Sequence, residues 1–311
     1  MEREKNFLSA VVYVRNAGKN ISAFLDMISK VLTENFEHSE IICVNDSSID
    51  NSAQVIREFA KNNENLPEIT ILNMSYFHGL EVAMNAGCDL AIGDFVMEFD
   101  TAEVDYNAEE IVKVYRKSLE GFDVVSASSD RKERGTSKLF YRIFDKYTDL
   151  KYSMHTETFR IISRRMINRI LSMNHSVPYR KALYAGSGLK SANITYTSKA
   201  GSSQHSLTKE EKKYRKTLAT DSLILFTRVG YSVSFSLTIF MMAVAIIVAV
   251  YSVVIFAVGH PVEGWTTTIL FLAVAFFGLF ATLTIVIKYL QMIVDLIFKR
   301  KKYNFEGIEK L

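Results

Sequence analysis

The 311-residue sequence has little cysteine and little net charge. Its two cysteines, Cys43 and Cys88, both lie in apolar segments of the first half. This argues against a disulfide framework and predicts buried thiols in a reducing compartment. The formal net charge of +3 gives no general reason to expect a nucleic-acid partner. The first residues, MEREKNF, are charged and lack the apolar core of a signal peptide. We therefore expect the first domain to stay in the cytoplasm.

Charged residues are nearly absent from one long stretch. Between positions 233 and 287 the only charged residue is Glu263, and basic residues crowd both flanks. Apolar runs at about 233–258 and 267–288 are each long enough to cross the roughly 30 Å hydrocarbon core as a helix. The connector is too short for anything but a tight hairpin, and Trp265 within it suits the headgroup zone. Buried soluble helices are the alternative. The positive-inside rule predicts a multi-pass protein of the inner (cytoplasmic) membrane with both termini in the cytoplasm.

Apolar runs of strand length alternate with helical patterns through the first half. The expected strands are Leu8–Val14, 41–44, 69–72 and 94–99. Apolar residues recur at helical spacing between them. This alternation predicts an α/β fold, with a parallel sheet that carries helices on both faces.

Carboxylates follow two of these strands. Asp100 ends the fourth strand, with Glu103 and Asp105 just beyond, and Asp46 and Asp50 follow the second. Ligands of open α/β sheets bind outside the carboxyl ends of the strands, so these acids predict a site for a sugar or a metal-chelated phosphate. The alternatives are a solvated acidic turn after the fourth strand and simple capping of the next helix after the second.

Several segments, in order, resemble the successive blocks of family 2 glycosyltransferases. The segments are VVYVRNAGKNI, IICVNDSSIDNSAQVI, FHGLEVAMNAGCDLAIGDFVMEFD, DRKERGTSKLFYRIFDKYTD, ETFRIISRRMI and GSSQHSL. The resemblance is strongest to the polyprenyl-phosphate glycosyltransferases, which include dolichol-phosphate mannose synthase and the bactoprenol glucosyltransferases. It implies a GT-A (Rossmann-like) nucleotide-sugar domain and a transfer that inverts the sugar's anomeric configuration.

The resemblance and the apolar runs together imply four parts. They are a cytoplasmic GT-A domain at 1–206, a juxtamembrane amphipathic helix segment at 207–230, a transmembrane hairpin at 231–298 and a basic cytoplasmic tail at 299–311. The implied enzyme moves a sugar from a nucleotide sugar to polyprenyl (undecaprenyl) phosphate, for cell-surface glycan or lipid-linked sugar synthesis. The alternatives are another lipid-linked or glycan acceptor, and a catalytically degenerate membrane scaffold or regulatory partner. Homo-oligomers are compatible with this reading.

The resemblance also assigns roles to individual residues. The implied catalytic residues are Asp100, Glu157 and Arg160. Those implied to bind the nucleotide sugar are Asn16, Asp46, Asp50, Gly79, Asp100 and Glu103. Those implied to hold the lipid phosphate are Arg131, Arg134, Arg142 and Ser203, for which a solvated basic face and a flexible linker are the alternatives. Independently of the resemblance, Arg160 stands in the apolar run FRII, so its charge needs an anionic partner.

The chain departs from the family pattern at three positions. The second acid of the D-x-D motif falls at Ala102, the following glutamine at Val104, and the acid before phenylalanine–arginine at Thr158. An alanine cannot ligate a metal, so metal binding would rest on Asp100 and Asp105. The sequence thus leaves open whether Mg²⁺ or Mn²⁺ takes part.

Overall fold

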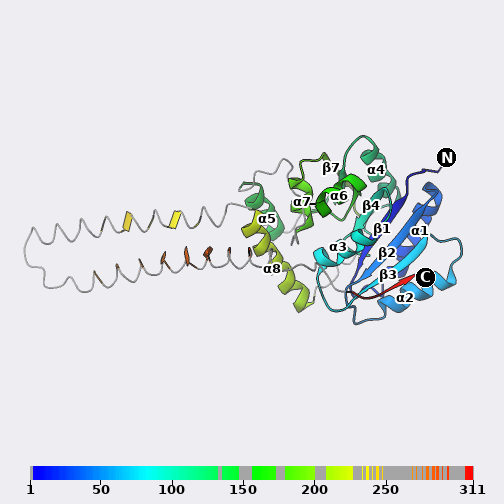
Figure 1. The fold of residues 1–311 in the computed structure, drawn as a ribbon, viewed down its shortest axis with the longest axis horizontal. Coiled ribbons are helices and arrows are strands. Elements are labelled where there is room, and N and C mark those ends of the chain that lie inside the picture. Colours follow the sequence, from blue (N-terminus) through cyan, green and yellow to red (C-terminus); the bar gives the residue numbers. More distant parts are fainter. Residues whose placement is uncertain are drawn as a thin grey trace, which may run out of the picture. The chain divides into compact units, whose positions relative to one another are not determined.

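Figure 1 shows the structure of the chain, which is a computed structural model. It describes residues 3–131, 135–146, 156–172, 179–199, 208–226 and 305–310, with isolated positions between 233 and 293. The chain divides into two compact units. The first comprises Met1–Asp145, Asp149–Leu218 and Lys299–Leu311, and the second Lys146–Thr148 and Ala219–Phe298.

An eight-stranded sheet forms the centre of the first unit, in the order β7-β5-β6-β4-β1-β2-β3-β8. The strands are β1 (Leu8–Val14), β2 (Ser39–Asn45), β3 (Glu68–Met74), β4 (Phe95–Phe99), β5 (Val124–Ser129), β6 (Phe159–Ser163), β7 (Ser191–Tyr196) and β8 (Phe305–Lys310). The α/β class and the first four strands expected from the sequence are confirmed.

The expectation of a parallel sheet holds only for part of it. Strand β1 pairs in parallel with β2 and β4, and β2 pairs in parallel with β3. Strand β6, however, runs antiparallel to both β4 and β5, and β8 runs antiparallel to β3. A strand buried on both faces reads as a continuous apolar run in either direction, so the sequence pattern cannot reveal its polarity.

Helices cover both faces of the sheet, as expected (Figure 1). Successive side chains of β1 point to opposite faces: Leu8 and Val12 belong to the core beneath α1, and Val11 to the core beneath α3. Helix α3 approaches closely because Gly87 has no side chain, and a Cβ there would lie 2.4 Å from Cγ1 of Val11. The helices are α1 (Ile21–Asn35), α2 (Ser52–Asn62), α3 (Leu80–Leu90), α4 (Ala108–Leu119), α5 (Gly135–Lys146), α6 (Arg164–Ser172), α7 (Arg180–Gly186) and α8 (Lys209–Phe226).

The last described strand closes one edge of the sheet. Strand β8 pairs with β3 and lies within the segment expected as a basic tail, 299–311. Arg57 of α2 donates two hydrogen bonds to the Glu309 carboxylate, at 2.5 and 2.6 Å, and the amide of Asn73 donates a third at 3.1 Å. These contacts fix the register of β8 against β3.

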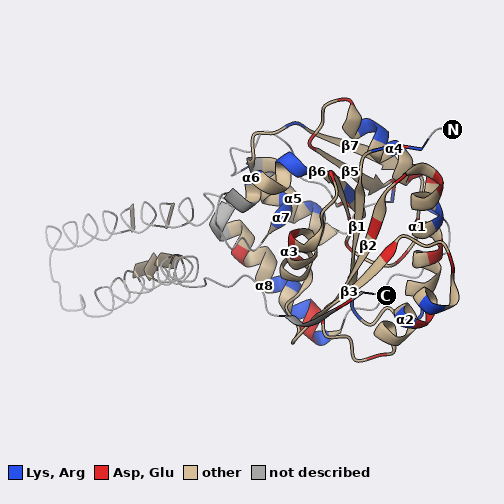
Figure 2. Cartoon of the chain, turned by 45° about the vertical axis from the view of Figure 1, so that its right-hand side comes forward, with Lys and Arg blue, Asp and Glu red and all other residues tan. Residues whose placement is uncertain are grey.

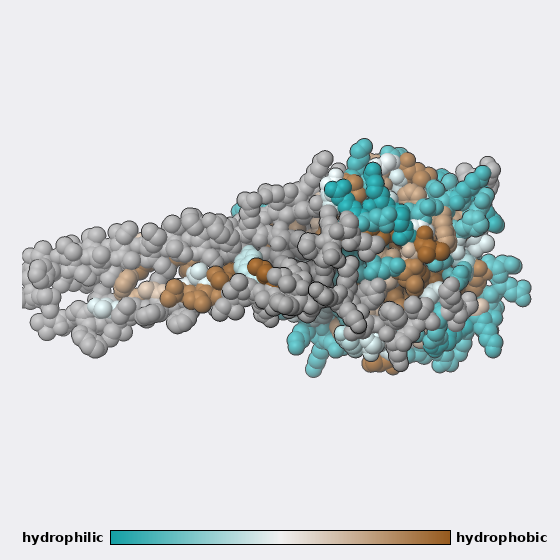
Figure 3. Space-filling view, in the orientation of Figure 1, coloured by the Kyte–Doolittle hydropathy of each residue, from teal (hydrophilic) through white to brown (hydrophobic). Residues whose placement is uncertain are grey.

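The second unit is described at the end of α8 and at isolated helical positions. Large apolar side chains are exposed at these positions, for example at Val233, Ile247 and Leu283 (Figure 3). Within the described part of the chain, no helix combines the length and the apolar character that crossing a membrane requires. The expected spans at 233–258 and 267–288 lie mostly outside the described residues.

Candidate active site

Asp46 lies at the carboxyl end of β2, where its fully buried carboxylate joins three chain segments. It accepts a hydrogen bond from the Tyr13 hydroxyl at 2.9 Å and from the backbone N–H groups of His78 and Gly79 at 2.8 Å each. Burial and, to a lesser degree, the neighbouring Asp46 raise the pKa of Tyr13, so that hydroxyl stays a donor. Asp46 therefore fastens the loop after β3 to the ends of β1 and β2. Its expected contact with a nucleotide stays a prediction.

Gly79 closes this loop in a conformation that only glycine adopts readily. Its φ is +84° and its ψ is 163°. A Cβ at this position would also lie 2.2 Å from Cζ of Tyr214 in α8. Both constraints, one in the backbone and one in the packing, require a residue without a side chain.

Replacing Gly79 by alanine is expected to lower the free energy of unfolding by about 1–3 kcal/mol for the backbone strain alone, and further for the clash. Chemical denaturation of the full-length protein in detergent measures this change. Gly121→Ala is the matched control, because Gly121 also has a positive φ, +92°, but no atom within 4 Å of the added Cβ. Equal losses of unfolding free energy in the two variants would show that the Tyr214 ring moves aside at no cost in stability.

Asn16 and Asp50 stabilise the neighbouring loops. The Asn16 side-chain oxygen accepts the N–H of Ile49 at 2.9 Å. Asp50 accepts the N–H groups of Gly18 at 2.9 Å and of Ser52, the first residue of α2, at 3.0 Å. Although burial raises it, these hydrogen bonds and one from the Ser52 hydroxyl hold the pKa of Asp50 below its usual value. Asp50 thus binds the first N–H of α2 from the position before the N-cap residue, Asn51, whereas Asp46, for which capping was the same alternative, binds Tyr13, His78 and Gly79.

Asp100 follows β4 and is bound by a buried arginine from the neighbouring strand. Arg160 of β6 donates to Asp100 at 2.6 Å, to Glu98 at 2.5 Å and to Glu157 at 2.8 Å. The antiparallel register of β4 and β6 places Glu98 opposite Arg160, which explains why the two charges meet. The guanidinium is fully buried, and Asp100 keeps 14% of its side chain exposed. The anionic partner expected for Arg160 is confirmed.

A second buried arginine reaches Asp100 from α7. Arg180 donates to Glu98 at 2.8 Å and to Asp100 at 3.3 Å. Its side chain and its backbone N–H donate to the carboxylate of Glu81, in α3, at 3.0 and 2.9 Å. Glu98 thus lies between the two guanidiniums, and each oxygen of Asp100 faces one of them. We call Glu81, Glu98, Asp100, Arg160 and Arg180 the arginine cluster.

Two carboxylates of the arginine cluster, those of Asp100 and Glu98, are ionised at neutral pH. Burial raises the pKa of Asp100, but Arg160, Lys181 and Arg180 outweigh burial and leave that pKa below its usual value. Burial likewise raises the pKa of Glu98, and Arg180 followed by Arg160 brings it down. The charges therefore stabilise one another in a place where either sign alone would be costly.

These lowered pKa values predict a loss of stability in acid. A carboxyl group with a folded-state pKa below its unfolded value of about 4 contributes stability above that value, and the contribution is lost as the pH falls through the folded pKa. We expect the thermal unfolding midpoint to fall between pH 7 and pH 3. Asp100→Asn should show a smaller fall because it has one fewer of these groups, and an identical fall would contradict this assignment.

Other predicted site residues lie apart from Asp100 or outside the described residues. The Asp105 carboxylate accepts the Tyr196 hydroxyl at 2.7 Å, and that hydroxyl contacts the Thr158 hydroxyl at 2.6 Å. Arg131 donates to Ser198 at 2.8 Å and to the carbonyl of Lys199. Helices α5, α7 and α8 carry basic residues (Figure 2), among them the exposed Arg142. The two predicted residues outside the described part are Arg134 and Ser203, and the backbone N–H of Glu103 donates to the Thr101 hydroxyl at 3.2 Å.

Comparison with known proteins assigns this arrangement to a family. Residues 9–176, more than half of the chain, match the family described as Glycosyl transferase family 2. The chain belongs to this family. The resemblance drawn from the sequence is therefore confirmed.

Individual relatives match over part of their length. An uncharacterized glycosyltransferase of Synechocystis sp. is 30% identical over 196 residues, which cover 61% of this chain and 60% of that protein. The undecaprenyl-phosphate 4-deoxy-4-formamido-L-arabinose transferase of Proteus mirabilis is 29% identical over 171 residues, covering 53% of this chain and 52% of that protein. The mannosyltransferase PcManGT from Pyrobaculum calidifontis, solved in complex with GDP-Man and Mn²⁺, is 13% identical with a TM-score of 0.49, covering 71% of this chain and 63% of that one.

The residues at and near the D-x-D motif of this chain offer too few ligands to hold a divalent cation by themselves. The second acid of the D-x-D motif is replaced by Ala102, which is 3% exposed. Asp105 binds Tyr196, and both oxygens of Asp100 face guanidiniums. Among the residues that the structure describes, no three His, Cys, Asp or Glu side chains are grouped as metal ligands. A divalent cation would therefore need most of its oxygen ligands from elsewhere.

Sequence reasoning missed three members of the arginine cluster. Glu98 carried a usable signal, because an acid inside the apolar strand Phe95–Phe99 needs a partner as much as Arg160 does. Glu81 and Arg180 carried none, since each lies in the first turn of a helix, where charged residues are ordinary.

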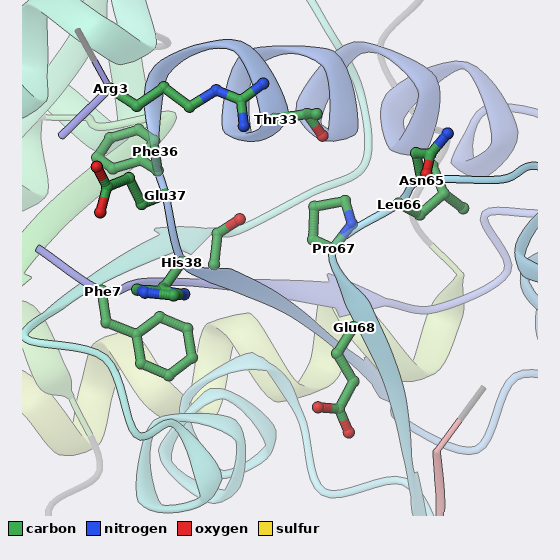
Figure 4. A pocket seen from close by; sticks show the side chains of 11 residues that line it. Arg3, Phe7, Thr33, Phe36, Glu37, His38, Asn65, Leu66, Pro67 and Glu68 are labelled. Atoms are coloured by element: carbon green, nitrogen blue, oxygen red, sulfur yellow. The ribbon is translucent and has the colours of Figure 1, made fainter. Parts of the chain in front are cut away.

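A hollow of about 390 Å³ lies at the opposite end of the sheet from Asp46 and Asp100. It is lined by residues where β1, β2 and β3 begin, including Phe7, His38 and Glu68 (Figure 4). Ligands of such sheets bind at the carboxyl ends of the strands, so this hollow is not the expected donor site.

Proposed function

We propose that this chain transfers a sugar from a nucleotide-sugar donor to a polyprenyl phosphate. The observation that carries the proposal is Asp100. In a family 2 domain it lies at the carboxyl end of β4, ionised, bound by two buried arginines and still 14% exposed. The relative named an undecaprenyl-phosphate transferase supports this class of acceptor.

The proposed reaction is a single displacement that inverts the anomeric centre. An oxygen of the lipid phosphate forms a bond to the anomeric carbon, and the bond from that carbon to the donor's diphosphate breaks. The bonding electrons leave with the nucleoside diphosphate. A phosphate is already anionic at neutral pH, so the nucleophile needs no general base. The chain must mainly position two anions and stabilise the leaving charge.

Lys181 is the cation that we assign to the leaving diphosphate. It follows Arg180 in α7, and its Nζ lies 3.8 Å from Glu157. Of the three cations that lower the pKa of Asp100, it is the most exposed, at 11% of its side chain against 0% for Arg160 and 2% for Arg180. Each arginine contacts three carboxylates at 3.3 Å or less, whereas Lys181 is 3.8 Å from Glu157, so Lys181 is the most available of these three cations.

We place this transfer at the cytoplasmic face of a membrane. A nucleotide sugar is dissolved in water and a polyprenyl phosphate is embedded in lipid, so the two meet only at the bilayer surface. The two apolar runs of the sequence and the exposed apolar side chains of the second unit support a membrane anchor. The first two turns of α8, Lys209–Lys216, carry more basic than acidic residues, which suits an interface with acidic lipids.

The experiment uses the full-length protein in nanodiscs that contain undecaprenyl phosphate. A panel of labelled sugar nucleotides is supplied with Mn²⁺ or with EDTA. We expect lipid-linked product from at least one donor and, since Asp100 is bound by arginines and Ala102 offers no ligand, retention of activity in EDTA. If the sugar is transferred to a different acceptor, that acceptor takes the place of polyprenyl phosphate in the proposed reaction. No product and no nucleotide binding by calorimetry would indicate a scaffold and overturn it.

A further inference from the structure

Helix α8 contacts the loops at the carboxyl ends of β1 and β3. Glu210 accepts a hydrogen bond from Arg15 at 3.1 Å. The same guanidinium donates to the carbonyl oxygens of Asp46 and Ser47, at 2.6 Å each, and lies 4.3 Å from the centre of the Phe77 ring. The first turns of α8 are thereby attached to the corner where Asp46 is buried.

Tyr214 makes the second attachment, one turn further along α8. Its ring packs edge-on against Phe77, with centroids 5.7 Å apart, and fills the space that a side chain at Gly79 would need. Burial, followed by the Glu81 carboxylate, raises the pKa of the Tyr214 hydroxyl, and the backbone N–H of Glu81, in the first turn of α3, lies near that hydroxyl and lowers it. Tyr214 therefore lies against the start of α3.

Glu81 connects this helix start to the arginine cluster. Its side chain is 2% exposed, and its carboxylate accepts both the backbone N–H and the Nε–H of Arg180. Arg180 in turn donates to Glu98 and Asp100. A shift of the first turn of α3 would therefore move the carboxylate that orients one of the two guanidiniums on Asp100.

We propose that Tyr214 is a positioning residue for Asp100, acting from α8 through the first turn of α3, Glu81 and Arg180. The inference rests on the proposed function in taking Asp100 as the site carboxylate. It adds that α8, the helix that precedes the two apolar runs in the sequence, contacts residues that in turn orient Asp100. Displacements of about 1 Å at such a site can cost roughly 100-fold in rate.

The kinetic test compares Tyr214→Phe and Tyr214→Ala in the full-length protein in nanodiscs. Phenylalanine keeps the ring and loses the hydroxyl, and alanine loses both. We expect kcat to fall roughly 10- to 100-fold in Tyr214→Ala and less in Tyr214→Phe, with the donor KM changed by less than about threefold. Thr217→Ala, at an exposed and uncharged position of the same helix, should match the wild type. Unchanged kcat in Tyr214→Ala would overturn the proposal.

A double-mutant cycle tests the route through Arg180. If Tyr214 acts through Arg180, combining Tyr214→Ala with Arg180→Lys should reduce kcat by clearly less than the product of the two single losses. Full multiplication of the losses would show that the two residues act independently and would remove Arg180 from the route.

Hydrogen exchange separates this inference from the proposed function, because it needs no substrate. In Tyr214→Ala we expect faster amide exchange at residues 78–81, in β4 near Asp100 and in α7. Faster exchange confined to 78–81 would overturn the inference even for an active enzyme. A wild type that makes no product with any donor would overturn the proposed function while exchange still decides the role of Tyr214.

Discussion

Replacing Asp100 by asparagine is expected to lower the rate of sugar transfer by roughly 100- to 1,000-fold, because positive charge develops at the anomeric carbon in the transition state and the variant loses an anion that would stabilise it. Asparagine keeps the size of the side chain and removes its charge. Arg160 and Arg180 would then share one less carboxylate, and the exposed edge of the cluster would no longer present an anion. The measurement is the initial rate of lipid-linked product formation at saturating donor.

Two comparisons make this result specific to Asp100. Asp26→Asn removes the charge of an exposed carboxylate on α1, paired with Lys30 at 2.7 Å, and should leave the rate unchanged. The unfolding midpoint of Asp100→Asn, measured in the same nanodiscs, shows whether the variant is folded during the assay. A folded Asp100→Asn protein that keeps more than about a tenth of the wild-type rate would contradict the assignment.

Replacing Arg160 by methionine is expected to lower the free energy of unfolding by about 3–5 kcal/mol, because it removes one of the two guanidiniums that balance the charges of Glu98 and Asp100. Glu98 is fully buried, and Asp100 and Glu157 are 14% and 15% exposed at their side chains, so water replaces little of the lost interaction. Methionine fills much of the same volume, which limits the contribution of a cavity. Denaturant unfolding with a linear extrapolation measures the change.

Lys30→Met is the control for Arg160→Met. Lys30 also binds a carboxylate, Asp26, but the two side chains are 67% and 54% exposed, and such pairs are worth about 0–1 kcal/mol. Adding Glu98→Gln to Arg160→Met should restore part of the lost unfolding free energy, since it removes one of the buried negative charges that Arg160 had balanced. A loss below about 1 kcal/mol in Arg160→Met would show that the cluster is better solvated than its burial indicates.

The sequence predicted the parts of the fold that depend on local pattern. Strands β1 to β4 are apolar runs between turn residues, and α1 shows helical spacing, so each could be predicted without knowing its neighbours. The need of Arg160 for an anion followed from one charge in an apolar strand, and the structure supplies three carboxylates.

The remainder depends on contacts between segments far apart in the chain. Nothing local distinguishes Arg180, at the start of α7, from an ordinary helix-surface arginine, yet it bonds residues 80 to 99 positions away. Asp105 follows Asp100 closely in sequence, but the chain turns away and pairs it with Tyr196. Spacing gives proximity along the chain, whereas a binding site depends on proximity in space.

The pairing of β8 with β3 has a consequence for biosynthesis. Asn73 and Glu309, which are hydrogen-bonded in the folded protein, are 236 positions apart, and the whole apolar segment is translated between them. During translation the outer edge of β3 therefore has no β8 partner for its backbone groups until both apolar runs and β8 itself have been synthesised. Exposed strand edges recruit other chains, so a nascent polypeptide of this length is most vulnerable to aggregation in that interval. The pairing of β8 with β3, which completes the sheet, is therefore a late step of folding that follows the synthesis of both apolar runs.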